Sequence, residues 1–364
     1  MLQDYPALPP TPQPPFALAP LLRQHFLTFL QPLLLRLDAQ IDRRLVHTFA
    51  ATIAAILMWR NRQHGLLLSE LGASILSPHQ APAGTKRLSN LLHSPKWSAD
   101  LIDHWLWEQA DAHVTTIAQS GDTPLLIWDE SVLEKPETVR AEDLCAVRSS
   151  KAARLKRIKP GFYNPPTGRP IHVPGLRWLG LLVVGQTLPP VVAAMHWWTT
   201  RGPRASDRRS EETRLLLQCR ATWGRRVQHV WDRGFAGSPW LGLALDSEVR
   251  FVLRWPKRYQ LVDGQGRERN AWKLLRGQRS WDHQWLWDGH ARQRRKVGVV
   301  ATPVTHANFP DQLWLVAARL GKGHEPWYLL TNDPAETVAA AWMAVLAYGR
   351  RWQIEMAWRY GKSE

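Results

Sequence analysis

Cysteine is scarce in this sequence: only Cys145 and Cys219 occur among 364 residues. Two isolated cysteines exclude a disulfide framework and a C-x-x-C zinc or redox motif, and they fit a reducing compartment. Long apolar runs are missing too. The most apolar stretch, from Leu45 to Trp59, carries polar residues and is shorter than the roughly twenty residues that cross a bilayer. The sequence therefore predicts a cytoplasmic chain that does not span a membrane.

Acidic residues are outnumbered, because 31 Asp and Glu stand against 47 Lys and Arg, which gives a formal net charge of +16. A charge of this size favours a polyanionic partner, and nucleic acid before a membrane surface. Basic residues are dense between Arg140 and Lys159. Phosphate contacts there would give affinity and salt dependence without sequence readout, although a solvated face explains any single charge equally well.

Hydrophobic periodicity divides the chain into regions of different character. The start is rich in proline, has no Lys or Arg before Arg23 and matches no signal-peptide pattern. Long helical periods follow, and after them shorter apolar runs predict a mixed α/β core with a β-rich insertion. The predicted parts are a flexible arm over 1–20, an all-helical DNA-binding domain over 21–122, the first part of the core over 123–252, the insertion over 253–332 and a final helix over 333–364.

The final helix has a well-defined predicted start. Asp333 is a suitable N-cap, Pro334 suits the first helical position, and Glu336 stands where a capping box places its acceptor. From this point the sequence predicts a single long helix that continues to the end of the chain.

Four side chains with polar or charged groups lie along this predicted helix. Tyr348, Arg351, Glu355 and Lys362 fall within roughly 60° of one another at about 100° per residue. Charged groups on such a stripe cannot face an apolar core, and a solvated face has no need of an aromatic ring. We therefore expect a polar ligand, with an ordinary salt-bridged surface helix as the alternative.

Two aspartates follow apolar runs that read as strands, Asp129 in PLLIWDES and Asp232 in VQHVWDRGF. Ligand sites of α/β sheets lie at the carboxyl ends of strands, whereas a lone aspartate in this position is often a turn residue. Together with Glu355, the two aspartates form an oxygen-rich set that suits magnesium. Glu130 and Glu134 lie close to Asp129 in the sequence and remain candidates for an additional ligand.

The spacing Tyr348-x2-Arg351-x3-Glu355-x6-Lys362 resembles the Y-x2-R-x3-E-x6-K signature of the insertion-sequence-four family of DDE transposases. The segments WDES, AAMHWW and DRGF are similar to the family as well. The resemblance covers roughly residues 124–362. It implies a ribonuclease-H-like mixed sheet core that carries the catalytic residues Asp129, Asp232 and Glu355, with a β insertion before the helix that holds the glutamate.

The resemblance also implies a reaction, its cofactors and its partners. The three acids would hold two Mg²⁺ or Mn²⁺ ions for phosphodiester hydrolysis and strand transfer. The partner would be double-stranded DNA, at transposon ends and at the target, in a bacterial, nucleoid-associated protein. A homodimer on DNA is expected if the C-terminal helical region of the family is present, whereas this chain ends two residues after Lys362.

Residues that would bind DNA next to the scissile bond follow from the same resemblance: Tyr348, Arg351 and Lys362 on phosphate oxygens, and Trp327 on a base flipped out at the cleaved end. Most of the 21 tryptophans are expected to serve packing, and Trp281, Trp285 and Trp287 carry little functional weight. Two alternatives stay open: a truncated or domesticated DNA-binding protein without turnover, and a ribonuclease-H-like nuclease without strand transfer.

Overall fold

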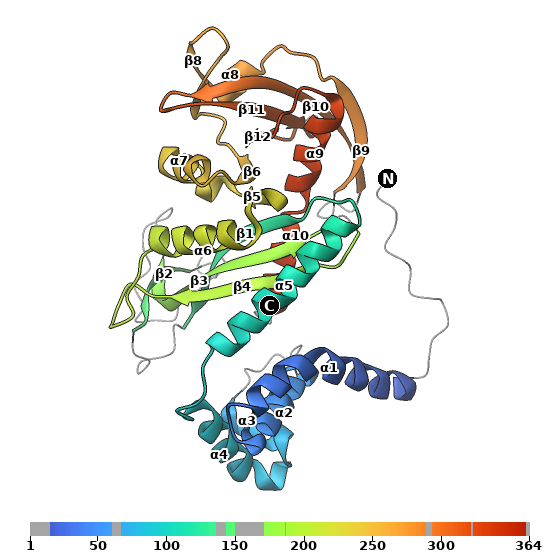
Figure 1. Cartoon of the computed structure of the whole chain (residues 1–364), viewed down its shortest axis with the longest axis vertical. Coiled ribbons are helices and arrows are strands. Elements are labelled where there is room, and N and C mark those ends of the chain that lie inside the picture. Colours follow the sequence, from blue (N-terminus) through green and yellow to red (C-terminus); the bar gives the residue numbers. More distant parts are fainter. Residues whose placement is uncertain are drawn as a thin grey trace, which may run out of the picture. The chain divides into compact units, whose positions relative to one another are not determined.

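The computed structural model describes residues 15–59, 67–135, 143–149, 171–185, 187–288, 293–321 and 323–361. The chain divides into two compact units, residues 1–105 and 106–362, and the boundary falls within helix α5 (Asp100–Gln119) (Figure 1). In the described part of the chain, no helix combines the length and the apolar character that a bilayer crossing requires.

The first unit contains only helical elements in its described residues. The helices are α1 (Pro15–Asp38), α2 (Arg43–Trp59), α3 (Leu68–Ile75), α4 (Ala81–Leu92) and the start of α5. Helix α1 begins at Pro15, inside the arm predicted over 1–20, because proline is compatible with the first helical position. Helices α3 and α4 touch at two glycines, since a Cβ on Gly84 would lie 2.1 Å from the carbonyl oxygen of Gly72.

The second unit is built on one large sheet, so the predicted mixed α/β class is confirmed. The strand order is β2-β3-β1-β5-β6-β12-β11-β10-β7-β8, with β4 paired to β3 and β9 paired to β10. The strands are β1 (Leu125–Glu134), β2 (Cys145–Arg148), β3 (His172–Val184), β4 (Val191–Trp198), β5 (Gln228–Trp231), β6 (Arg250–Arg254), β7 (Gln260–Val262), β8 (Glu268–Asn270), β9 (Asp282–Asp288), β10 (Gln293–His306), β11 (Phe309–Arg319) and β12 (Trp327–Thr331).

Strands β1, β3 and β4 form an antiparallel meander, and β5 and β6 run parallel to β1. The helices of this unit are α6 (Arg208–Trp223), α7 (Ser238–Asp246), α8 (Ala271–Leu274), α9 (Val338–Gly349) and α10 (Trp352–Gly361). The predicted order of three strands, a helix, a strand and a short helix holds for β1, β3, β4, α6, β5 and α7. The short strands β2, β7 and β8 were not predicted, and neither was β9.

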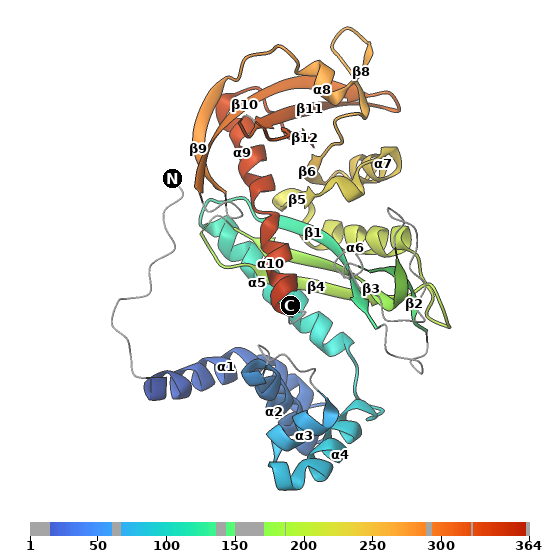
Figure 2. The ribbon, with the colours of Figure 1, turned by 180° about the vertical axis from the view of Figure 1, so that it is seen from behind.

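The predicted β-rich insertion continues the sheet of the core. Strand β12 pairs with β6 through Leu329 and Arg254, and β11 and β10 extend the sheet from there. Side-chain alternation gives this sheet two buried faces. Trp128 and Trp231 pack on the face covered by α5, α6 and α7, whereas Ile127 and Val230 pack on the opposite face, along which α9 and α10 follow one another (Figures 1 and 2).

The prediction of one long C-terminal helix is wrong, because the segment forms two helices. Helix α9 ends at Gly349, α10 begins at Trp352, and Arg350 and Arg351 form a turn between them. The N–H of Arg351 donates to the carbonyl of Tyr348 at 3.0 Å, three residues back, as in a tight 3₁₀ turn. The single helical stripe expected for Tyr348, Arg351 and Glu355 therefore does not exist.

The predicted helix start at Asp333 is also wrong. The carboxylate of Asp333 accepts hydrogen bonds from Arg250 Nε at 2.9 Å and from Gln228 Nε2 at 2.6 Å, so it joins β5 and β6 to the segment before α9. The N-cap is Thr337, whose Oγ1 accepts from the N–H of Ala340 at 3.1 Å. Asp333 thus forms a tertiary ion pair with Arg250 and does not act as the N-cap that local capping rules predict.

Candidate catalytic site

Asp129 lies on β1, and Asp232 directly follows β5, the neighbouring parallel strand. The last parallel pair is Ile127 with Val230, and each aspartate stands two residues further along its strand direction. Because side chains alternate, both carboxylates point to the face that α9 and α10 cover. Asp129 does not end its strand as predicted, since β1 continues to Glu134, but the parallel pairing ends before it.

Tyr348, at the end of α9, is bonded to the second aspartate. Its hydroxyl donates to Asp232 Oδ1 at 3.0 Å and accepts from Arg254 Nη1 at 3.4 Å. Burial, followed by the negative charge of Asp232, raises the pKa of Tyr348 to about 12, so the phenol remains a donor at neutral pH. In this structure Tyr348 therefore positions Asp232, and its use on a phosphate oxygen stays a prediction.

Arg351, in the turn between α9 and α10, neutralises the acids. Burial alone would raise the pKa of Asp232, but Arg351, the N–H of Arg233 and the Tyr348 hydroxyl more than offset it, so the pKa lies below its usual range. Arg351 also forms an ion pair with Glu355, whose side chain is 48% exposed. The turn thus places one guanidinium among carboxylates from three segments of the chain.

Asp129 has the opposite electrostatic character. Burial raises its pKa to about 7; the charges of Glu355, Asp232 and Glu130 add to this effect, and Arg351 opposes it. Two neighbouring aspartates with pKa values pushed apart are typical of a functional site, although structural ion-pair networks produce such shifts too.

Glu130 and Glu134 are separated from Asp129 by the alternation of β1. Glu130 points to the other face of the sheet, where its Oε2 lies 2.8 Å from Arg208 Nε. Glu134 has the same parity and accepts a hydrogen bond from Ser149 Oγ at 2.6 Å. The structure therefore gives neither glutamate a place beside the two aspartates.

The two aspartates fit a divalent cation, because they offer carboxylate oxygens from neighbouring strands on one face of the sheet. Within the described residues, no three His, Cys, Asp or Glu side chains lie close enough together to hold one ion. Glu355 is held by Arg351 instead. A third carboxylate ligand therefore requires Glu355 to turn away from Arg351, which its half-exposed side chain permits.

Trp327, at the start of β12, packs against the same tyrosine. The ring centroids of Trp327 and Tyr348 are 5.1 Å apart with planes at 70°. The indole is partly buried and borders the acid site, while its use as a base-stacking platform stays a prediction. Lys362 lies outside the described residues, and so does most of the basic run from Arg140 to Lys159, of which Arg148 is an exposed residue of β2.

Arg254 is the site residue that the sequence analysis missed. It stands on β6 two residues after Val252, which pairs with Val230, so it continues the row of Asp129 and Asp232. Its guanidinium lies 5.8 Å from the centroid of the Tyr348 ring. The alternation in FVLRW places Val252 and Arg254 on one face of the strand. The sequence does not show that this face is the one that carries Asp129 and Asp232, because that depends on the pairing of β6 with β5.

A glycine allows α10 to approach the sheet at this site. Gly180 lies on β3 directly opposite Asp129. A Cβ at residue 180 would lie 1.8 Å from Cζ2 of Trp358, a residue of α10 that is 5% exposed. Because Trp358 stands three residues after Glu355, the missing side chain at Gly180 sets the position of that glutamate.

The variant Gly180→Ala is expected to lower the free energy of unfolding by about 1–3 kcal/mol, because the added methyl overpacks a buried aromatic contact. Urea unfolding measures this change. Gly264→Ala is the matched control, since a Cβ there meets no atom within 4 Å. Adding Trp358→Leu to Gly180→Ala should restore part of the loss relative to the sum of the single changes. Equal stability of the two glycine variants would contradict the role of Gly180.

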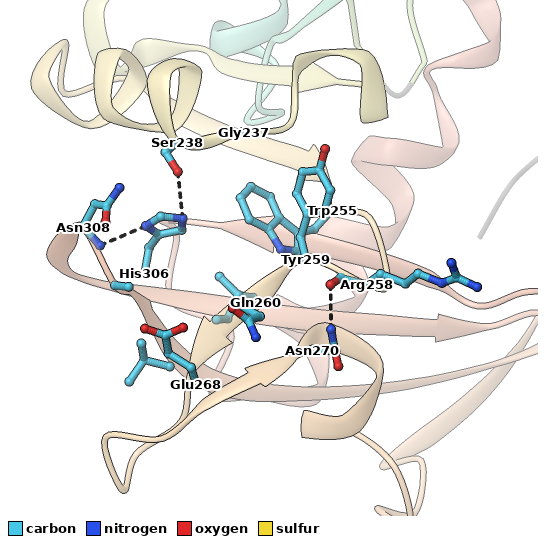
Figure 3. A pocket seen from close by; sticks show the side chains of 13 residues that line it. Gly237, Ser238, Trp255, Arg258, Tyr259, Gln260, Glu268, Asn270, His306 and Asn308 are labelled. Carbon is cyan, nitrogen blue, oxygen red and sulfur yellow. Dashed lines mark hydrogen bonds between the residues drawn. The ribbon is translucent and has the colours of Figure 1, made fainter.

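A separate pocket of about 430 Å³ lies among α7, β7, β8 and the β10–β11 turn (Figure 3). Trp255 and Tyr259 form one wall. His306 Nδ1 accepts from the N–H of Asn308 at 3.1 Å, and its Nε2 lies 3.3 Å from Ser238 Oγ. Several of its polar groups are engaged with one another, and none of the predicted site residues lines it.

No protein-family model matches this chain, and no curated protein matches its sequence. Among solved structures, the chain is similar to a piggyBac transposase in a synaptic complex with hairpin DNA, with 13% sequence identity and a TM-score of 0.43. The similarity covers 87% of this chain and 58% of the transposase chain, so the chain spans less than two thirds of that protein.

Proposed function

We propose that this chain is a DNA transposase of the DDE class, which cuts DNA at transposon ends and joins those ends to target DNA. The observation that carries the proposal is the contact between the C-terminal signature and the two aspartates. Tyr348 donates to Asp232 across 116 residues of sequence, and Arg351 acts on the charges of both aspartates.

The topology of the second unit supports a ribonuclease-H-like core. A three-stranded antiparallel meander is followed by two strands parallel to the first, with helices in the connections. The acids lie on β1, directly after β5 and on the helix that ends the described chain. On the sequence signature, we assign the chain to the insertion-sequence-four family and expect it to act as a homodimer on DNA if the C-terminal helical region of the family is present.

Each residue of the site has a task in this reaction. Asp129 and Asp232 would hold a divalent cation, and Glu355 would join them after leaving Arg351. Tyr348 keeps Asp232 in place through its hydroxyl. When bound, the metal ions would activate the attacking oxygen and stabilise the leaving oxygen of an in-line displacement. Arg351, once released from Glu355, and Arg254 supply positive charge for the phosphate that is transferred.

The experiment that tests the proposal incubates the full chain with linear DNA that carries the sequences flanking its own gene. We expect cuts at defined positions with Mg²⁺ or Mn²⁺, joined products when target DNA is added, and no reaction with EDTA. Binding without any cut would favour the DNA-binding protein without turnover. Hydrolysis that is not followed by joining would favour the nuclease.

A further inference from the structure

Strand β9 presents large aromatic side chains to solvent. It pairs with β10 and borders the sheet (Figures 1 and 2). Trp285 is 64% exposed and Trp287 is 59% exposed, whereas an indole normally buries most of its apolar surface. Two exposed indoles that stand two residues apart on one strand point to the same side and form a continuous patch.

Cations accompany the two indoles on this patch. In the antiparallel register, Trp287 lies opposite Arg294 and Trp285 lies opposite Lys296. Directly opposed residues of an antiparallel pair share a face, so each indole has a positive neighbour across the strands. Arg294 and Lys296 are both exposed. We refer to Trp285, Trp287, Arg294 and Lys296 as the ribbon patch.

The side of β9 opposite the ribbon patch packs against the rest of the protein. Leu286 packs against the core that contains α9, and Asp282 Oδ2 accepts a hydrogen bond from Trp342 Nε1 at 2.8 Å. Trp342 belongs to α9, so two side chains of β9 hold this strand in place. The indoles therefore face outward, because Leu286 between them points to the opposite, packed side of the strand.

We propose that the ribbon patch binds single-stranded nucleic acid, with unpaired bases stacked on Trp285 and Trp287 and phosphates held by Arg294 and Lys296. Proteins that bind single strands combine aromatic and cationic side chains, because bases stack on the aromatic rings and phosphates pair with the positive charges. A hydrophobic protein partner would leave both cations without a counter-charge.

The exposed indoles favour an unpaired strand over a duplex. In a duplex, neighbouring bases cover each other's faces, and taking a base out of the stack costs free energy. An unpaired strand leaves its base faces free to stack on Trp285 and Trp287. The patch shares no residue with the acid site, so its binding of nucleic acid depends neither on metal ions nor on the proposed transposase activity.

The test measures fluorescence anisotropy of labelled oligothymidylate and of a duplex hairpin of matched length, with the full chain in EDTA. The double variant Trp285→Leu, Trp287→Leu is expected to weaken oligothymidylate binding by about tenfold or more, since stacking on an aromatic is worth at least about fivefold for each base. The variant with phenylalanine at both positions should bind oligothymidylate with an affinity within about threefold of the parent, because phenylalanine keeps an aromatic face for stacking.

Two further variants decide the proposal. Trp197→Leu, at a 43% exposed tryptophan of β4, should leave oligothymidylate binding unchanged. The double variant Arg294→Gln, Lys296→Gln should reduce the salt dependence of log K by about 0.7 for each lost phosphate contact. The proposal would be overturned if the leucine double variant bound oligothymidylate as tightly as the parent, or if the leucine and phenylalanine variants lost the same affinity. It would also be overturned if the leucine variant changed its oligomeric state and not its affinity.

Discussion

The variant Asp232→Asn is expected to cut DNA at least about a thousandfold more slowly than the parent, because metal ions contribute several kcal/mol to such reactions and each 1.4 kcal/mol is about tenfold in rate. Asparagine has nearly the same shape and keeps an oxygen that accepts from the Tyr348 hydroxyl, which lies 3.0 Å from Oδ1. It lacks the charge that a divalent cation requires. Single-turnover cleavage of end-containing DNA with Mg²⁺ measures the effect.

A matched control separates this effect from a general loss of acidic charge. Asp246 is exposed at the end of α7, so Asp246→Asn should cleave DNA at the parental rate. Affinity for uncut DNA in EDTA should not fall in Asp232→Asn, since the substitution removes a negative charge from a basic protein. Parental cleavage by Asp232→Asn would remove Asp232 from the catalytic set.

A second large effect is expected from His229, which is fully buried on β5. Burial lowers the pKa of His229 to about 3 from its ordinary value of 6.5, and its Nδ1 accepts a hydrogen bond from Trp128 Nε1 at 3.0 Å. The unfolded chain takes up this proton near pH 6.5 and the folded chain only near pH 3. The stability that neutral His229 contributes above pH 6.5 is therefore lost as the pH falls through this window, in total on the order of 5 kcal/mol.

Other groups titrate in the same range, so a variant must isolate the histidine. Burial raises the pKa values of Asp129 and Glu212 to about 7, and their contribution acts in the opposite direction, since it is lost as the pH rises. Between pH 7 and pH 4.5, the parent should lose about 2–3 kcal/mol more than His229→Gln, measured by urea unfolding. His172→Gln, at an exposed position, should follow the parent. Parallel curves for parent and His229→Gln would contradict the prediction.

Much of the second unit could be predicted from the sequence because its strands are short apolar runs between clear breaks. The runs LLIW and VVAAMHWW mark β1 and β4, and WYLLT marks β12. Two of the three candidate acids were predicted by the same logic, since a polar residue directly after an apolar run stands out. Glu355 was predicted from its spacing to Tyr348 and Arg351.

The features that sequence reasoning missed depend on contacts between distant segments. Asp333 has every local property of an N-cap, but Arg250 and Gln228 bind it in the folded chain. The turn at Arg351 lies inside a run with helical periodicity, and it brings the guanidinium to Glu355 and toward Asp129. Local propensity predicts neither the ion pair of Asp333 nor the turn at Arg351, because both depend on tertiary contacts between distant segments.

The tryptophans show the same limit. A sequence cannot tell an indole that fills a core, such as the fully buried Trp231, from one that faces solvent, such as Trp285. Both stand in apolar or mixed strands. Only the pairing of β9 with β10 shows that Trp285 has Lys296 beside it and that its neighbour Leu286 is the packed residue.

The pairing of β6 with β12 has a consequence for chains that stop early. A nascent or prematurely terminated chain without β12 leaves one side of β6 unpaired at Val252, Leu253 and Arg254. Open apolar edges recruit strands from other molecules. Chains that end before β12 are therefore expected to aggregate through this open edge.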